Sequence, residues 1–128
     1  MTLSFGAVRA QKTETNTFNL NGTWIPVKQE IGGRDLPAAA FEKYKLIMTD
    51  SIYIYSVVDQ DKGVIKYSNG KMDIYGKEGP NAGKHYTAIY KLEKGQLIIC
   101  YNLAGDSYPE GCDTKVKPTL FLSVYNKQ

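Results

Sequence analysis

The chain has 128 residues, of which 42% are hydrophobic and 23% are charged. This is the length of one domain and the composition of a folded protein, so neither intrinsic disorder nor a second core is expected. The net charge of +3 comes from lysines spread along the chain, which argues against nucleic acid as a partner. No apolar run approaches the roughly 18 to 20 residues of a membrane-spanning helix.

Residues 1–20 are predicted to be an N-terminal tail, and residues 21–128 a single domain. Residues 1–11 form a short apolar piece that ends in small residues, as an export signal does. The piece lacks a basic start and is shorter than a normal apolar core. It is therefore interpreted as the remnant of an export signal, and the alternative is a disordered polar tail over residues 11–19.

The abundance of Tyr and Gly, at 10 and 12 residues, favours pleated strands and tight turns over helices. One short helix is expected in residues 35–43, where Asp35 can cap it and Pro37 precedes three alanines. Alternating polarity and short apolar runs predict eight strands, at residues 21–31, 44–48, 52–58, 63–68, 71–75, 85–92, 96–103 and 119–125.

The connections between these strands alternate in length. Residues 49–51, 69–70 and 93–95 form tight turns, whereas residues 32–43, 59–62, 76–84 and 104–118 form longer loops. In an up-and-down meander the tight turns gather at one end and the loops at the other, which we call the closed end and the mouth. Because closure removes the open edges, we predict an all-β, eight-stranded antiparallel up-and-down barrel. Such a barrel is just wide enough to be filled by side chains or to hold one small ligand.

Several short motifs resemble those of one protein family. The first, Asn21-Gly22-Thr23-Trp24, is similar to the Gly-x-Trp signature of lipocalins. The second is Gly33-Arg34-Asp35-Leu36-Pro37. The others are Ile89-Tyr90-Lys91-Leu92 followed by Leu97 and Cys100, and a last strand that ends near Lys127. Over residues 20–127 the chain resembles a family of small, mostly exported bacterial lipocalin-like domains of unknown function. The resemblance implies a lipocalin-like (calycin-type) barrel and, by analogy, small-molecule binding outside the cytoplasm. It also implies that Trp24 packs across the closed end, with Lys127 as its basic partner.

Two cysteines, Cys100 and Cys112, lie twelve positions apart. In an exported protein they can form a disulfide, and closing this loop would add about 3 kcal/mol of stability in the chain-entropy model. Two free thiols that pack as small hydrophobic groups are the alternative. Their spacing is not that of a zinc site.

No motif predicts a metal, a cofactor or a catalytic centre. Residues 79–84 lack the glycine spacing and the following helix of a phosphate-binding loop, and residues 59–70 lack the ligands of a calcium loop. The single histidine, His85, is interpreted as a solvated or capping residue. A barrel can nevertheless gather catalytic groups from distant strands, so an enzyme acting on a hydrophobic substrate stays open.

The tyrosines are the best candidates for ligand contacts, because a buried phenol offers a large apolar surface with a polar tip. Tyr86 and Tyr90 alternate with Thr87 and Lys91 and are expected to face the interior. Tyr53 and Tyr55 share a face that can be either inside or outside, since aromatic pairs also form on outer surfaces.

The long loop of residues 104–118 is expected to border the mouth, because loops of this length seldom persist without a use. Tyr108 is its candidate for a lid and Phe41 is a candidate contact from the helix, unless the loop merely seals the mouth. The leading hypothesis is an exported protein that binds a small amphipathic ligand. The alternatives are a side-chain-filled barrel that binds another protein or an envelope component, and a barrel enzyme.

Overall fold

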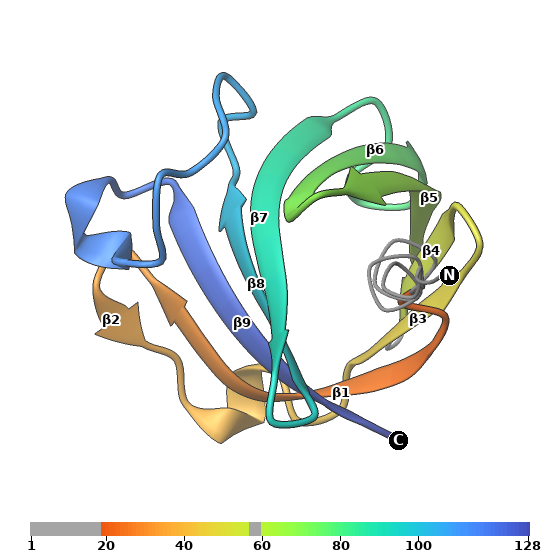
Figure 1. Cartoon of the computed structure of the whole chain (residues 1–128), viewed down its shortest axis with the longest axis horizontal. Coiled ribbons are helices and arrows are strands. Elements are labelled where there is room, and N and C mark those ends of the chain that lie inside the picture. Colours follow the sequence, from red (N-terminus) through yellow and green to blue (C-terminus); the bar gives the residue numbers. More distant parts are fainter. Residues whose placement is uncertain (1–18, 57–59) are drawn as a thin grey trace, which may run out of the picture.

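The computed structural model describes residues 19–56 and 60–128. One antiparallel sheet curves round on itself (Figure 1). Its strands are β1 (Gly22–Ile31), β2 (Arg34–Asp35), β3 (Lys45–Thr49), β4 (Ile52–Ser56), β5 (Asp61–Ser68), β6 (Lys71–Glu78), β7 (His85–Glu93), β8 (Gln96–Asn102) and β9 (Leu120–Lys127). Two 3-10 turns, η1 (Ala38–Ala40) and η2 (Thr114–Val116), lie in the β1–β3 and β8–β9 connections.

Eight of these strands close into a barrel. β1 pairs with β3 on one side and with β9 on the other, and each strand from β3 to β9 pairs with the next. β2 pairs only with the end of β1. The predicted all-β, eight-stranded antiparallel up-and-down barrel is therefore confirmed, and closure removes the open edges of the sheet as expected.

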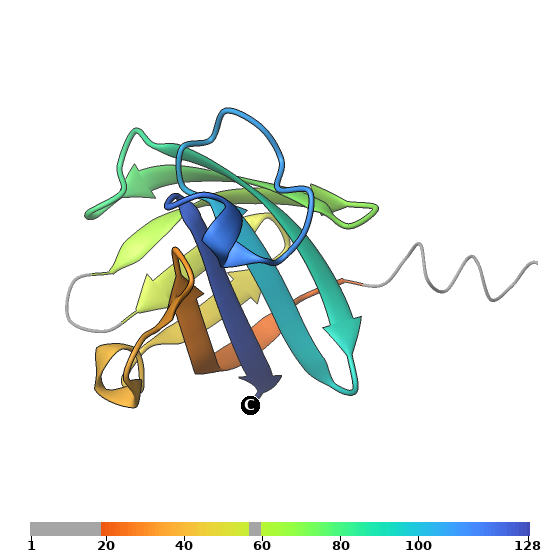
Figure 2. The same cartoon turned by 90° about the vertical axis from the view of Figure 1, so that its left-hand side faces the viewer.

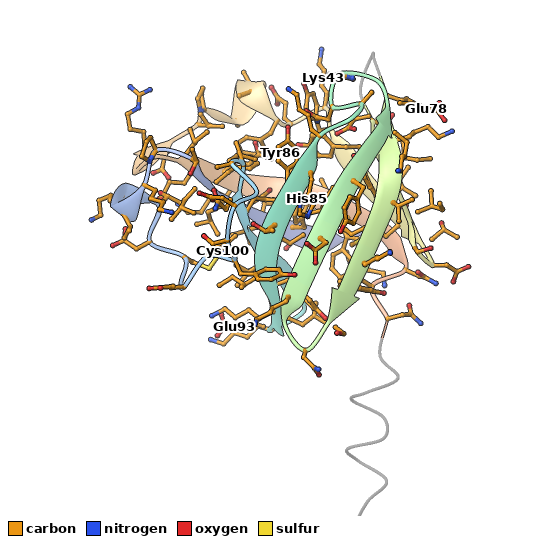
Figure 3. The ribbon with its side chains drawn as sticks, turned by 90° about the horizontal axis from the view of Figure 1, so that it is seen from above. Lys43, Glu78, His85, Tyr86, Glu93 and Cys100 are labelled. Atoms are coloured by element: carbon orange, nitrogen blue, oxygen red, sulfur yellow. A yellow bond between two sulfur atoms is a disulfide. The ribbon has the colours of Figure 1, made fainter. Side chains whose placement is uncertain are left out.

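The connections separate into two ends as the sequence predicts. Figure 2 shows the β5–β6 and β7–β8 hairpins on the right and the β6–β7 connection on the left. In Figure 3, Lys43 and Glu78 lie at the mouth, whereas Glu93 lies at the closed end. The β5–β6 turn has positive φ at both Asn69 and Gly70, as the two-residue hairpin turn of an Asn-Gly pair requires.

A β-bulge in β1 decides which of its side chains enter the barrel. Pro26 pairs with Tyr125 and Lys28 with Val124, so Val27 is an extra residue without a partner on β9. Trp24 and Pro26 are buried before the bulge, and Gln29 is buried after it. The bulge thus changes which positions of β1 face the interior, from even-numbered residues before it to odd-numbered residues after it. As a result, the side-chain amide of Gln29 enters the barrel.

The core is densest at the closed end. Trp24 is 2% exposed, its indole Nε1 donates a hydrogen bond to the Leu20 carbonyl at 2.9 Å, and the Lys127 Nζ lies 4.9 Å from the centre of its ring. Leu20 is 1% exposed and also binds the Tyr67 hydroxyl through its backbone N–H. The packed chain therefore includes Leu20, which the sequence assigned to the tail.

The short helix predicted in residues 35–43 is present only as the three-residue 3-10 turn η1. Asp35 does not cap a helix, because it belongs to β2 and pairs with Glu30 of β1. The turn η1 begins after Pro37, which makes no side-chain capping hydrogen bond. Short helices need tertiary support because their first turn is costly to form, and no residue of η1 is buried. A second 3-10 turn, η2, was not expected. Among the described residues, no helix has the length and apolar character needed to cross a membrane.

Among the described residues, three strand ends differ from the prediction by two or more residues, and one of them is the end of β9, which continues to Lys127 instead of ending at residue 125. β5 begins at Asp61, two residues early, because Asp61 already pairs with Tyr55 on β4. β6 continues to Glu78 instead of ending at residue 75. The predicted strand 52–58 is observed as far as Ser56, and its last two positions lie outside the described residues.

Candidate functional site

A cavity of about 320 Å³ lies inside the barrel and reaches residues next to the mouth. Its aliphatic lining consists of Ile31, Leu46, Ile65, Ile74 and Leu103. Its aromatic lining consists of Tyr53, Tyr55, Tyr86, Tyr101, Phe121 and Tyr125. Asp61 and Asn81 complete the lining. The interior is thus partly hollow, and its surface is mainly apolar with a few polar atoms.

The six predicted ligand contacts divide into two groups. Tyr53, Tyr55 and Tyr86 line the cavity. Tyr90 packs against the core near the closed end, with its ring centre 5.7 Å from that of Tyr67 and its backbone N–H bound to the Gly70 carbonyl. Phe41 is 5% exposed but is not among the cavity-lining residues.

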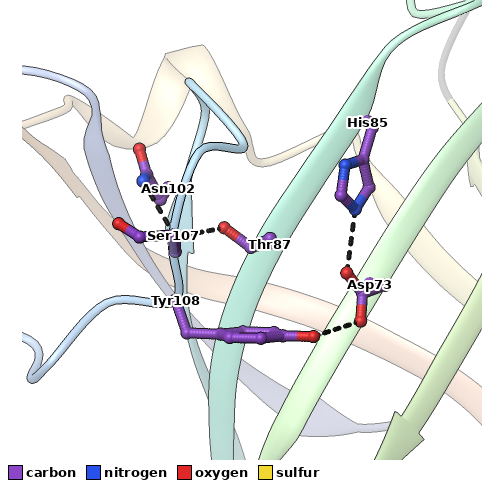
Figure 4. Close-up of polar contacts among 6 residues, drawn as sticks. All are labelled: Asp73, His85, Thr87, Asn102, Ser107 and Tyr108. Carbon is purple, nitrogen blue, oxygen red and sulfur yellow. Dashed lines mark hydrogen bonds and ion pairs between the residues drawn. The ribbon is translucent and has the colours of Figure 1, made fainter.

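The sixth residue, Tyr108, is on the outside of the barrel. Its hydroxyl donates a hydrogen bond to the Asp73 Oδ2 at 2.5 Å (Figure 4). Asp73 lies on β6 between Met72 and Ile74, which face inward and are buried. The expectation that Tyr108 closes the mouth is therefore wrong in this structure. The loop turns away from the mouth because its polar atoms find partners on the outer wall.

A buried carboxylate is the main polar group of the cavity. Asp61 is 8% exposed, and its two oxygens accept hydrogen bonds from the Tyr53 hydroxyl at 2.8 Å and from the Asn81 Nδ2 at 2.7 Å. Asn81 in turn accepts a hydrogen bond from the Tyr86 hydroxyl at 2.7 Å through its Oδ1. Burial and the bond to Asp61 both raise the pKa of Tyr53, so its phenol stays protonated and acts as a donor.

Two glycines allow this arrangement. A side chain at Gly63 would collide with the Tyr75 carbonyl and come within 2.8 Å of the Tyr53 ring, so the ring can lie over its cross-strand partner only if that partner is glycine. A side chain at Gly76 would collide with the Asn81 carbonyl. Close backbone approach at these two positions brings Tyr53 and Asn81 to the carboxylate.

The connection that carries Asn81 is held by its own backbone. The Gly76 N–H donates to the Lys84 carbonyl, and the Gly83 N–H donates to the Gly76 carbonyl. The Lys84 N–H donates to the Asn81 carbonyl. This compact turn points one amide into the barrel. The glycines of residues 79–84 therefore form a turn and not a phosphate-binding loop, as their spacing in the sequence predicts.

A second polar group crosses the interior from β1 to β8. The Gln29 Nε2 donates to the Tyr55 hydroxyl and to the Ser123 Oγ, both at 3.1 Å. The hydroxyls of Tyr101 and Tyr125 lie 2.9 Å apart. Desolvation raises the pKa of Tyr55 and of Tyr101, so these phenols are neutral hydrogen-bonding groups near neutral pH.

The outer wall carries a different cluster, shown in Figure 4. The Asp73 Oδ1 lies 2.8 Å from the His85 Nε2, and the His85 ring stacks on Tyr75 with ring centres 4.6 Å apart. Partial burial opposes ionisation of Asp73, but the hydrogen bonds from Tyr108 and His85 outweigh it and hold the pKa of Asp73 below its usual value. His85 thus meets a carboxylate outside the barrel, whereas the barrel-enzyme hypothesis needs a polar pair, such as a carboxylate and His85, to converge inside.

The loop between β8 and β9 is fastened to this outer wall at several points. Cys100, on the outer face of β8, is disulfide-bonded to Cys112, with Cα atoms 5.5 Å apart. The Ser107 carbonyl accepts hydrogen bonds from the Thr87 hydroxyl at 2.6 Å and from the Asn102 Nδ2 at 3.0 Å. In Figure 2 the loop lies in front of β8 and β9. Of the two alternatives for the cysteines, the structure shows the disulfide.

Half of the polar site is not among the residues predicted from the sequence. Asp61 and Asn81 fall in predicted loops, within motifs that fit neither a calcium loop nor a phosphate-binding loop. A usable signal was the alternation of Asp61, Gly63 and Ile65, which places the three on one face of a strand. No local signal indicates that Asn81 turns inward. Within residues 19–56 and 60–128, no three His, Cys, Asp or Glu side chains gather as metal ligands do.

Comparison with protein-family models and with curated proteins found no match to this chain.

Proposed function

We propose that this protein binds a small amphipathic molecule inside a lipocalin-like barrel. The cavity of about 320 Å³ is the observation that carries the proposal. Its volume is at the lower end of the range of about 300 to 1,000 Å³ for small-molecule pockets, and its mainly apolar lining with a few convergent polar groups is typical of such pockets. A side-chain-filled barrel, which the protein-interaction hypothesis requires, would not leave this space.

Two further observations support the lipocalin-like part of the proposal. Trp24 lies at the closed end with the Lys127 ammonium over its ring, which is the arrangement that the Gly-x-Trp resemblance implies. The disulfide between Cys100 and Cys112 is of the kind that persists in oxidising compartments and so supports export. We therefore place the protein outside the cytoplasm as part of the proposal.

The proposal is tested by filling the cavity. Ile31→Trp adds a large ring at a lining position of β1, and Val27→Trp adds the same ring at the bulge, where Val27 is 44% exposed on the outside. We expect the neutral fluorophore N-phenyl-1-naphthylamine to bind the parent protein and the Val27→Trp variant equally. The Ile31→Trp variant should bind it about tenfold more weakly or not at all.

Native mass spectrometry of protein purified from its own host provides an independent measurement, since a retained molecule appears as added mass. Equal uptake of the fluorophore by both variants would show that binding occurs outside the cavity. Together with the absence of any retained molecule, that result would favour the protein-interaction alternative.

A further inference from the structure

The Asp61 carboxylate is buried without a cationic partner from the described part of the chain. The ion pairs found there join Lys28 to Asp35, His85 to Asp73 and Lys91 to Glu93, and no described basic side chain lies within 4.0 Å of Asp61. Burying a carboxylate is costly unless it is paired and hydrogen-bonded. The hydrogen-bond partners of Asp61 among the described residues, Tyr53 and Asn81, are both neutral.

Asp61 can accept more hydrogen bonds than the protein supplies. A carboxylate has about four acceptor positions, and Tyr53 and Asn81 occupy one on each oxygen. All the protons in this group point toward Asp61, because Tyr86 donates to Asn81, and Asn81 and Tyr53 donate to the carboxylate. The carboxylate therefore lies at the cavity surface with two neutral donors directed at it and with room for a further donor.

The remainder of the cavity suits a cation attached to an apolar body. Asp61 is the one charged side chain among the described residues that line it. The neighbouring lining is rich in aromatic rings, including Tyr53, Tyr55 and Tyr86, whose faces attract positive charge. An anionic ligand would instead be repelled by Asp61 and would find no basic side chain among these residues.

From this geometry we infer that the cavity binds a small organic ammonium ion, whose N–H groups donate to the Asp61 carboxylate while its apolar part contacts the aromatic and aliphatic lining. The inference rests on the proposed function and adds the charge of the ligand. Asp61 is the counter-ion, and Asn81, Tyr53 and Tyr86 position it.

Three compounds of nearly the same shape test the sign of the charge. They are 2-phenylethylammonium, the neutral 2-phenylethanol and the anionic 3-phenylpropanoate, each with a phenyl ring on a two-carbon arm. In isothermal titration calorimetry with the intact protein at neutral pH, we expect the ammonium ion to bind about tenfold or more tightly than the alcohol, because charge-assisted hydrogen bonds are roughly twice as strong as neutral ones. The anion should bind most weakly.

Asp61→Asn tests the residue, since it removes the charge and keeps the shape. We expect about a tenfold or greater loss of affinity for 2-phenylethylammonium, with 2-phenylethanol bound within about threefold of its parent affinity. The matched control is Asp50→Asn, which removes the same charge at the exposed β3–β4 turn, where φ is +57° and asparagine is well tolerated. This control should retain the full preference for the ammonium ion.

The outcomes separate the inference from the function on which it rests. Equal binding of all three compounds, or an ammonium preference that survives Asp61→Asn, overturns the inference and leaves the proposed function standing. Failure of the parent protein to bind the three compounds and the naphthylamine fluorophore overturns both. If Asp61→Asn does not fold, the order of the three affinities for the parent protein decides the question by itself.

Discussion

The two ends of the barrel interior differ in how they are filled. At the closed end, Leu20, Trp24 and Met48 are at most 2% exposed and belong to one continuous core. Toward the mouth, the rings of Tyr86 and Tyr101 border a cavity instead of meeting in the middle. Stability is therefore concentrated at one end, and the other end can keep space and polar groups that a packed core would exclude.

The two sides of the barrel wall show the same contrast in their carboxylates. Asp61 on the inside and Asp73 on the outside each accept a hydrogen bond from a tyrosine hydroxyl. Asp73 also meets His85, so residues of the chain satisfy it, and the result is an anchor for the β8–β9 loop. Asp61 has only neutral partners among the described residues. Each carboxylate accepts one hydrogen bond per oxygen, so the difference lies in the surroundings: Asp73 is partly exposed beside a histidine, whereas Asp61 is buried at the wall of a cavity.

Removing the tryptophan of the closed end should have the largest effect on stability. Trp24→Ala deletes a buried ring and its hydrogen bond to Leu20, and we expect a loss of about 3 to 5 kcal/mol in the free energy of unfolding. Chemical denaturation measures this loss. Val27→Ala, on the exposed bulge, should change the stability by less than about 0.5 kcal/mol. A loss below about 1 kcal/mol for Trp24→Ala would contradict the importance of the closed end.

Removing the disulfide should have an intermediate effect and should leave binding intact. We expect Cys100→Ala combined with Cys112→Ala to lower the free energy of unfolding by about 3 kcal/mol, because the closed loop spans only twelve positions. Uptake of the naphthylamine fluorophore should stay unchanged, since neither cysteine lines the cavity. Treatment of the parent protein with a reductant is the control and should produce the same loss. Impaired uptake in either case would show that the outer loop shapes the mouth.

Breaking the anchor on the outer wall should have the smallest effect, and this effect should depend on pH. Tyr108→Phe removes one hydrogen bond to Asp73, for which we expect a loss of about 1 kcal/mol at neutral pH. The folded protein holds the pKa of Asp73 below its unfolded value of about 3.9. The contribution of Asp73 is therefore complete above that value and is lost as the pH falls through the lower folded pKa.

The pH dependence is measured by denaturation of the parent protein and of Tyr108→Phe at neutral and strongly acidic pH. The difference between them should shrink in acid. Tyr75→Phe is a suitable control, because it keeps the ring that stacks on His85 and, among the described residues, its hydroxyl has no hydrogen-bond partner. A difference that is constant with pH would show that the Tyr108 hydroxyl does not act through the ionised Asp73, and no difference at either pH would show that Tyr108 contributes through its ring alone.

The barrel itself follows from local features of the sequence. Alternating polarity sets the strands, and Asn69-Gly70 sets a hairpin turn because both residues adopt positive φ. Alternating connection lengths separate the mouth from the closed end, and an eight-stranded meander has to close to remove its edges. These features depend on residues that are close together in the sequence, so they can be predicted from a single sequence.

Three features were decided only by the tertiary structure. The bulge at Val27 depends on the register between β1 and β9, the first and last strands of the barrel. This bulge turns the Gln29 side chain inward. The β8–β9 loop follows hydrogen-bond partners on β6 and β7, so its length could not show whether it covers the mouth or the outer wall. The cavity's carboxylate group joins Asp61 to Asn81, twenty positions away, through a turn that closes against Gly76. Such contacts form between segments that are distant in sequence, and no local periodicity specifies which polar groups meet inside a closed barrel.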